Sequence, residues 1–349
     1  MRTESITRRR VLVEAAGLAL LAAGCAPRRT RAAGYSAALV LDTGGVDDRS
    51  FNAAAWAGMQ RAMKELHVHG AYIESKSPAD YQVNLTEYAN MGVNLVFAIG
   101  YKMADALKPV AVQFPHVDFA IVDTDAPDLP NCAGLKFREE EGTFLVGYLA
   151  ASVTKTKKIG FVGGEDIPLI EKFEAGYRAG AKTADPAVAV ISAYTGDWND
   201  LNKGKSQAMQ EFGNGADIIF QAAGKAGLGV IEAARERGPG FYAIGVDQDQ
   251  DDIAPGRVLT SMIKHTDTAV YDMVEEGLRG KFRPGPHIYG LKEDGVGLSP
   301  MKYTRQDVPP SVRHHLTTLV DMILEGKINI PVTLAAVPSF VPPHLPAGG

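Results

Sequence analysis

The sequence has very little cysteine and none of the common motifs of phosphate-binding or hydrolytic enzymes. Its 349 residues include two cysteines, Cys25 and Cys132. Gly-x-x-x-x-Gly-Lys-Ser/Thr, His-Glu-x-x-His and Gly-x-Ser-x-Gly are all absent, so no local signature of a P-loop, a zinc protease or an α/β-hydrolase is present. The formal net charge of −5 argues against nucleic acid as a partner. We therefore expect a protein that is not an enzyme and holds no metal or cofactor.

The N-terminal residues lack a hydrophobic run long enough to cross a membrane, because the apolar stretch 15–23 is too short. Arg8-Arg9-Arg10 precedes this stretch, as in a twin-arginine or general secretion signal. Leu21-Ala-Ala-Gly-Cys25 follows and resembles a bacterial lipoprotein cleavage box. We expect residues 1–24 to be a signal peptide, Cys25 to carry lipid, and residues 25–36 to tether the protein to the extracytoplasmic face of the cell membrane. The alternative is an ordinary signal peptide with an incidental cysteine.

Lipidation of Cys25 would leave Cys132 without a disulfide partner, so we expect Cys132 to be a small buried residue. Removal of residues 1–24 takes away four arginines and two glutamates, which moves the net charge from −5 to about −7. The expected mature protein is therefore more acidic than the full chain.

The remaining 315 or so residues show alternating strand and helix patterns, which predict an α/β fold with parallel sheets covered on both faces. Apolar strand-like runs occur at 37–41, 71–74, 95–99, 119–122, 159–162, 188–192, 218–220, 242–246 and 258–263. Helical patterns lie between them, for example at 82–91, 143–153, 201–212 and 228–237. These units are too numerous for one five-stranded sheet and indicate two similar lobes. We expect residues 37–134 and 248–280 in lobe 1, residues 135–247 and 281–332 in lobe 2, and a C-terminal tail at 333–349.

The loop after the first predicted strand combines two glycines, three carboxylates and an aromatic residue. It reads Asp42-Thr-Gly-Gly-Val-Asp-Asp-Arg-Ser-Phe51-Asn52. In open α/β sheets the carboxyl edge of the strands is where ligands bind. Asp42, Asp47 and Asp48 would repel a phosphate, and Gly-x-Gly-x-x-Gly is missing. The loop therefore suits a neutral, hydroxyl-rich ligand with a flat face.

An ordered set of motifs over roughly residues 37–332 resembles one protein family. The set comprises the Asp42 loop, the Asp123 strand end, Gly142-x-x-x-x-Gly-Tyr-Leu-Ala, Phe173-x-x-Gly-Tyr, Gly204-Lys, Gly215-Ala-Asp and Ile244-Gly-Val-Asp-Gln-Asp-Gln. It resembles the basic membrane protein family of substrate-binding lipoproteins, whose best-known branch binds purine nucleosides. This resemblance implies a type I periplasmic binding protein fold, in which two Rossmann-like lobes close by a hinge. It also implies an ABC permease and ATPase as partners.

The resemblance implies that two aromatic residues stack on the base of a nucleoside. These are Phe51, at a loop-to-helix junction, and Phe173, at the start of a helical pattern; core packing is the alternative for each. Asp42 and Asn52 flank Phe51 and would bind the base edge, since an asparagine offers both a donor and an acceptor. Asn52 could instead cap the helix, a role for which Ser50 competes.

The remaining candidate ligand contacts lie at or just after the ends of later strands, and the resemblance supplies the role of Lys264. Asp123 and Asp247 would accept hydrogen bonds from the sugar diol, with a turn or cap role as the alternative. Lys264 would reach acceptor atoms of the purine or be a solvated surface lysine. Gly224 would allow close approach of the backbone. Trp198 is expected near the mouth of the cleft or the hinge, without an assigned role.

Other functions remain open at this stage. The ligand could be another small polar molecule, such as a nucleobase or a sugar. The protein could act as a sensor instead of serving an importer, or it could be a nucleoside hydrolase that uses the carboxylates of the first loop.

Overall fold

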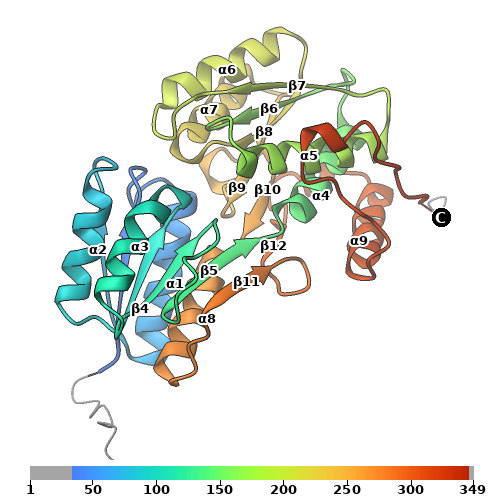
Figure 1. Cartoon of the computed structure of the whole chain (residues 1–349). Helices are drawn as coiled ribbons and strands as arrows, with labels where there is room; N and C mark the ends of the chain where they lie inside the picture. The colour runs from blue at the N-terminus through green and yellow to red at the C-terminus, as the bar shows by residue number, and fades with distance from the viewer. Residues whose placement is uncertain (1–33, 346–349) are drawn as a thin grey trace, which may run out of the picture. The chain divides into compact units, whose positions relative to one another are not determined.

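Two six-stranded sheets flanked by helices organise residues 34–345, the part of the chain described by this computed structural model (Figure 1). The first sheet has the order β11-β5-β4-β3-β1-β2 and the second the order β12-β10-β9-β8-β6-β7. Adjacent strands are parallel except β10 and β12. The predicted α/β architecture of two parallel-sheet lobes is confirmed.

The first sheet and its helices form lobe 1. Its strands are β1 (Ser36–Leu41), β2 (His69–Glu74), β3 (Leu95–Ile99), β4 (Asp118–Val122), β5 (Cys132–Phe137) and β11 (Gly285–Tyr289), and its helices are α1 (Phe51–Leu66), α2 (Asp80–Asn90), α3 (Ala104–Gln113) and α8 (Thr266–Leu278). Alternate residues of β1 face opposite sides of the sheet. Leu39 belongs to the apolar cluster that includes Met59 of α1 and Met273 of α8, whereas Val40 belongs to the cluster of α2 and α3. Helices on both faces explain why the strands are continuous apolar runs.

The second sheet and its helices form lobe 2. Its strands are β6 (Lys158–Gly163), β7 (Ala189–Tyr194), β8 (Ile218–Ala222), β9 (Tyr242–Asp247), β10 (Val258–Lys264) and β12 (Val296–Leu298), and its helices are α4 (Glu139–Val153), α5 (Pro168–Ala184), α6 (Leu201–Gly213), α7 (Gly227–Arg237) and α9 (Pro310–Leu324). Phe161 of β6 packs with Tyr177 of α5, and Val162 packs in the cluster of α6 and α7. This lobe repeats the layered plan of lobe 1.

The chain crosses between the lobes at three places, two of which differ from the predicted boundaries. The first crossover, from β5 to α4, falls close to the predicted one. The predicted crossing near residue 248 is wrong, because β10 pairs with β9 and β12 and so belongs to lobe 2; the chain crosses after Lys264. The predicted return at residue 281 is also early, because β11 pairs with β5 in lobe 1. The third crossover follows Tyr289.

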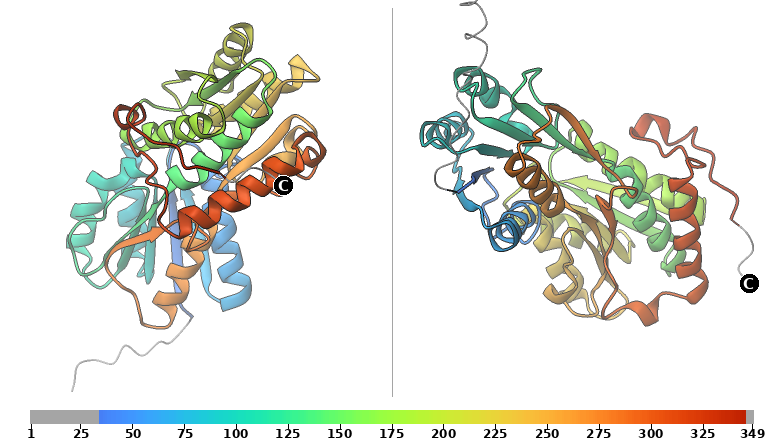
Figure 2. Two further views of the ribbon diagram at one scale, coloured as in Figure 1. Left: turned by 90° about the vertical axis from the view of Figure 1, so that its right-hand side faces the viewer. Right: turned by 90° about the horizontal axis from the view of Figure 1, so that it is seen from below.

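The C-terminal segment packs on lobe 2. Helix α9 lies beside α4, and the segment after it lies along α5 (Figures 1 and 2). Phe340 is buried, with its ring edge-to-face against Phe144 at 6.1 Å. Lys182 donates to the carbonyl oxygens of Pro338 at 3.0 Å and Phe340 at 2.8 Å. The predicted C-terminal tail is therefore packed against lobe 2 in its described part, residues 333–345.

The two cysteines of the chain lie in different parts of it, and only Cys132 falls within the described residues. Cys132 is buried, as predicted, and forms no disulfide among residues 34–345. Burial raises the pKa of its thiol to about 12, which makes it a poor nucleophile. The signal peptide and Cys25 lie outside the described residues. Among residues 34–345, none of the helices has the length and apolar character that a membrane crossing requires.

Candidate ligand-binding site

A cavity lies between the two lobes of the described chain. Its walls are the carboxyl ends of strands from both sheets and the first turns of α1 and α5. All eight residues predicted to bind ligand line it: Asp42, Phe51, Asn52, Asp123, Phe173, Gly224, Asp247 and Lys264. Residues 60 or more positions apart in sequence thus meet at one site, which the topology of parallel sheets makes possible.

The loop after β1 is held by Asp48, which the sequence analysis did not single out as a cap. Its carboxylate accepts from the backbone N–H groups of Ser50, Asn52 and Ala53 at 2.8–3.0 Å and therefore caps α1. Asn52 does not cap the helix through its side chain. Its Nδ2 donates to Asp42 Oδ1 at 2.7 Å and to Asp48 Oδ2 at 3.0 Å.

These bonds fix the orientation of the Asn52 amide, because the reverse orientation would place its oxygen against two carboxylates. Its Oδ1 is buried and has no hydrogen-bond partner among the described residues. Asp42 also accepts from Gly44 N at 2.8 Å. Burial raises the pKa of Asp42, against the lowering effect of its bond from Asn52. This wall of the cavity therefore offers hydrogen-bond acceptors.

Asp123 and Asp247 occupy equivalent positions at the ends of β4 and β9, and both have left-handed backbone conformations. Their φ angles are 71° and 66°, a region that non-glycine residues seldom adopt. Strain of this kind persists where the surrounding structure demands it, and it clusters at ligand sites. Ser50 of lobe 1 donates its hydroxyl to Asp247 of lobe 2. Burial raises the pKa of Asp247 to about 7, despite the opposing effects of Lys264 and Ser50.

Lys264 is a buried lysine, so its reading as a solvated surface residue is wrong. Its Nζ lies 2.6 Å from Asp123 Oδ1 and 3.2 Å from Glu139 Oε1. Glu139 also pairs with Lys172. Burial alone would lower the pKa of Lys264, but Asp123, Glu139 and Asp247 raise it above its usual range. The ammonium group therefore stays charged at the wall of the cavity.

The predicted aromatic pair comes from opposite lobes. Phe51 begins α1 in lobe 1 and Phe173 lies in α5 of lobe 2, and the centres of their rings lie 5.2 and 5.7 Å from Lys264 Nζ. Gly224 has a φ of +56°, which favours glycine. The Trp198 ring packs against Gly164 and lines the cavity near Gly224. Aromatic side chains thus line the same cavity as the carboxylates of Asp42, Asp123 and Asp247.

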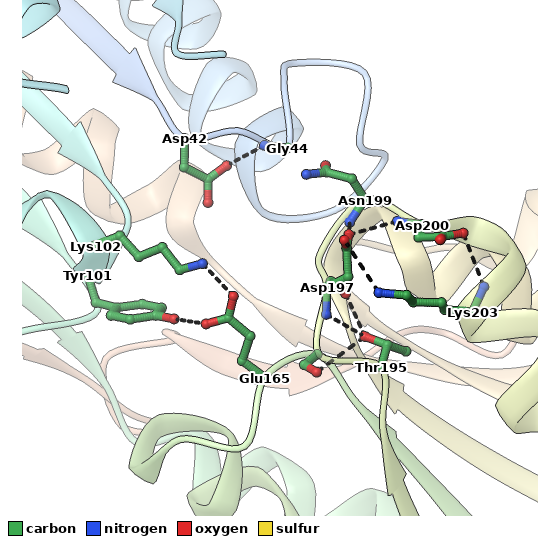
Figure 3. A network of polar contacts seen from close by, with 11 residues as sticks. Asp42, Gly44, Tyr101, Lys102, Glu165, Thr195, Asp197, Asn199, Asp200 and Lys203 are labelled. Carbon is green, nitrogen blue, oxygen red and sulfur yellow. Dashed lines mark hydrogen bonds and ion pairs between the residues drawn. The ribbon is translucent and has the colours of Figure 1, made fainter. Parts of the chain in front are cut away.

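A polar bridge joins the lobes beside the cavity (Figure 3). Tyr101 and Lys102 of lobe 1 both donate to Glu165 of lobe 2, at 2.8 and 2.5 Å. Burial tends to raise the pKa of Glu165, but the bonds from Lys102 and Tyr101 lower it overall. The neighbouring turn in lobe 2 is ordered by Asp197, whose carboxylate accepts from the N–H groups of Asn199 and Asp200 at 2.7 and 3.0 Å.

Glu139, Tyr101 and Glu165 were not identified from the sequence. Glu139 begins a run of three glutamates directly after a crossover, and this signal could have been recognised. Tyr101 and Glu165 each follow a buried strand by two residues, one residue further on than Asp42, which follows β1 directly. Their pairing spans 64 residues, and no local pattern predicts such a partner.

Two α/β lobes enclosing a cavity lined by aromatic rings and carboxylates define a binding protein of the type I periplasmic class. The family model described as "ABC transporter substrate-binding protein PnrA-like" matches residues 35–329. The chain belongs to this basic membrane protein family of ABC transporter substrate-binding proteins, which are extracytoplasmic and are not enzymes.

Named relatives agree with this membership. The chain is 39% identical to "Basic membrane protein A" of Borreliella burgdorferi, over 74% of this chain and 78% of the relative. It is 35% identical to the "ABC transporter nucleoside-binding protein BmpA" of Lactococcus lactis, over 93% and 99% of the two chains. An ABC transporter solute-binding protein from Aeropyrum pernix has a similar structure, with a TM-score of 0.78, 28% identity, and coverage of 87% of this chain and 96% of that one.

Proposed function

We propose that this protein captures nucleosides, purine nucleosides first among them, in the cavity between its lobes and delivers them to an ABC importer. The observation that carries the proposal is the combination of two phenylalanines from opposite lobes with carboxylates at several strand ends around one cavity. A base needs flat surfaces, and a ribose needs acceptors for its hydroxyls. The nucleoside-binding relative from Lactococcus lactis supports the same ligand class.

The proposed base contacts lie on both sides of the cavity. Phe51 and Phe173 stack on the base, and each stacking contact contributes on the order of 1–3 kcal/mol. Asp42 and the free Oδ1 of Asn52 accept from donor groups of the base. Lys264 is ion-paired with Asp123 and Glu139, and its ammonium group, which carries three N–H donors, also donates to an acceptor on the ligand.

The proposed sugar contacts are Asp123 and Asp247, with Gly224 allowing the backbone to approach the ligand. Both aspartates line the cavity, and the strained backbone at each strand end supports a ligand role. A carboxylate can accept from two vicinal hydroxyls at once. Loss of affinity in 2′- or 3′-deoxy nucleosides would support this assignment, and equal affinity for the free base would contradict it.

The membrane anchor is the second part of the proposal. Cys25 carries the lipid, residues 25–36 form the tether, and the binding unit meets the permease and ATPase assembly at the membrane. The cleavage-box sequence supports this part. A protein with one cysteine-linked diacylglycerol and an amide-linked acyl chain would satisfy the two-chain requirement for stable attachment.

Native mass spectrometry of protein produced without its first 25 residues tests the ligand class. We expect a co-purified mass that matches a purine nucleoside, released intact on denaturation. Free base together with ribose, produced on incubation with inosine, would instead indicate a hydrolase. An empty protein that gives no heat with a panel of nucleosides would favour a nucleobase or sugar receptor.

A further inference from the structure

The bridge of Tyr101, Lys102 and Glu165 uses both oxygens of one carboxylate. Tyr101 Oη donates to Oε2 at 2.8 Å, and Lys102 Nζ donates to Oε1 at 2.5 Å. Figure 3 shows both donors reaching from the turn after β3 to Glu165 beyond the end of β6. Because the donors belong to lobe 1 and the acceptor to lobe 2, the bridge exists only while the lobes are close together.

The bridge lies away from the connections between the lobes. The crossovers leave β5, β10 and β11, which lie at or next to one end of each sheet. Strands β3 and β6, which lead into the bridge, lie further along the two sheets. A rotation about the crossovers separates distant points most, so these residues would move apart when the cavity opens.

Glu165 reaches the ligand site through another side chain. Tyr101 and Trp198 line the cavity, whereas Glu165 does not. Bonds from Lys102 and Tyr101 hold the pKa of Glu165 below its usual value, although burial opposes them, so Glu165 remains an anion at neutral pH. The Glu165 and Lys102 side chains are 27% and 30% exposed. This partial burial strengthens the charge-assisted hydrogen bond between them, and the remaining exposure lets added salt weaken it.

We propose that Glu165 is a positioning residue that holds the cavity closed and sets the residence time of the ligand. It clamps Tyr101 against the cavity and ties Lys102 to the opposite lobe. Ligand escape requires this bridge to break, whereas capture begins from the open form, in which it is absent. The bridge therefore acts mainly on the dissociation rate. The contacts Ser50–Asp247 and Lys264–Asp123 also join the lobes, but they belong to the proposed ligand site itself.

The kinetic test compares the full chain with its Glu165→Gln and Lys102→Met variants. Stopped-flow fluorescence reports binding through Trp198, with guanosine as the probe. We expect each variant to release guanosine about tenfold faster, with an association rate within about twofold of wild type. The double variant Lys102→Glu/Glu165→Lys should recover most of the residence time. Asp185→Asn, which removes the Lys157–Asp185 pair on the surface of lobe 2, is the matched control and should change neither rate.

Unchanged dissociation in both variants, or a loss confined to the association rate, would overturn the proposal. The kinetic readout rests on the proposed nucleoside function, so a second measurement uses no ligand. Spin labels at Val83→Cys in α2 and Met209→Cys in α6, both exposed positions on different lobes, report the distance between lobes in a Cys25→Ala background. We expect a closed population in the ligand-free protein that Glu165→Gln depletes.

The two measurements separate the two claims. If the ligand-free wild type shows no closed population, the bridge does not have the proposed role, whatever the ligand is. The same conclusion follows if wild type and Glu165→Gln show equal closed populations. A guanosine signal missing from wild type, together with loss of the closed population in Glu165→Gln, would contradict the nucleoside assignment and support the bridge.

Discussion

The burial of Asp247 determines the pH range in which we expect the ligand to bind. Its pKa is raised to about 7, with burial as the main cause. In the proposed role its ionised form accepts from the sugar hydroxyls, so binding favours loss of the proton. Affinity is therefore present above pH 7 and is lost as the pH falls through the pKa of the ligand-free protein.

The first prediction is a pH dependence of nucleoside affinity. Below pH 7 the affinity should fall by up to about tenfold per pH unit, and above pH 8 it should be level. Isothermal titration calorimetry between pH 5.5 and 8.5 measures this. Asp247→Asn should bind more weakly and lose the dependence near pH 7. A slope that persists in this variant would assign the titration to another group.

The second prediction concerns aromatic stacking and sugar recognition. Phe51→Ala and Asp247→Ala should each weaken nucleoside binding by at least about tenfold, or roughly 1.4 kcal/mol. Phe282→Ala, which alters a partly buried aromatic outside the cavity, is the control and should leave the dissociation constant unchanged. Wild-type affinity in both site variants would remove the site assignment.

At the scale of elements, two of the sequence motifs serve helix packing. A Cβ at Gly180 of α5 would lie 1.9 Å from the carbonyl oxygen of Phe144 in α4, and a Cβ at Gly147 of α4 would lie 2.0 Å from that of Tyr177 in α5. These reciprocal contacts bring the two helices close. Gly147, the second glycine of Gly142-x-x-x-x-Gly147, and Tyr177, the last residue of Phe173-x-x-Gly-Tyr, both lie at this contact, which supports the helix that carries Phe173.

The third prediction follows from this close approach. Gly180→Ala should destabilise the protein by about 1–3 kcal/mol, because the added methyl group meets backbone that has no room to yield. Gly213→Ala is a matched helical control, since no described atom outside its own stretch of helix lies within 4 Å of its Cβ position. Urea unfolding compares the two. Equal unfolding free energies would show that α4 and α5 can separate without cost.

All nine predicted strands are present. Fully buried parallel strands such as β3 are continuous apolar runs, whereas β2 and β7, at the outer ends of the sheets, were predicted although all their residues are exposed or half-buried. Strands β5, β11 and β12 were not predicted from the sequence. Lys136 interrupts the apolar pattern of β5, Pro286 lies in the edge strand β11, and β12 is three residues long. Missing β11 also displaced the predicted lobe boundary, since nothing local shows which sheet a strand joins.

The site was predictable to the extent that it lies at strand ends. Asp42, Asp123 and Asp247 could be placed at the carboxyl ends of strands from the sequence pattern, whereas the roles of Phe51, Phe173 and Lys264 came from the family resemblance. The charges around Lys264 and the bridge to Glu165 could not be anticipated, because they join groups far apart in sequence across two lobes. Electrostatic partners of this kind become visible only with the three-dimensional arrangement.

At the scale of the whole molecule, the fourth prediction concerns membrane attachment. The wild-type chain expressed in its native type of host should fractionate with membranes, and its mature mass should exceed that of residues 25–349 by the mass of the lipid. Cys25→Ala should release the protein into the soluble fraction. Cys132→Ala, at a buried site, should leave attachment unchanged, and equal fractionation of all three proteins would refute the anchor.

Lobe closure is needed to assemble the proposed site, because the proposed ligand contacts come from both sheets. A ligand that bridges the lobes stabilises the closed form over every state that cannot bind it. The nucleoside as a whole should therefore bind far better than either of its halves, since base and sugar each engage only part of the cavity.

Calorimetric titration of the protein with adenosine, guanosine and inosine, each beside its free base and ribose, tests the central claim most directly. We predict one saturable site for at least one purine nucleoside, with its free base and ribose bound at least about a hundredfold more weakly. Binding of the free base as tight as that of the nucleoside, or no heat with any nucleoside, would contradict the account.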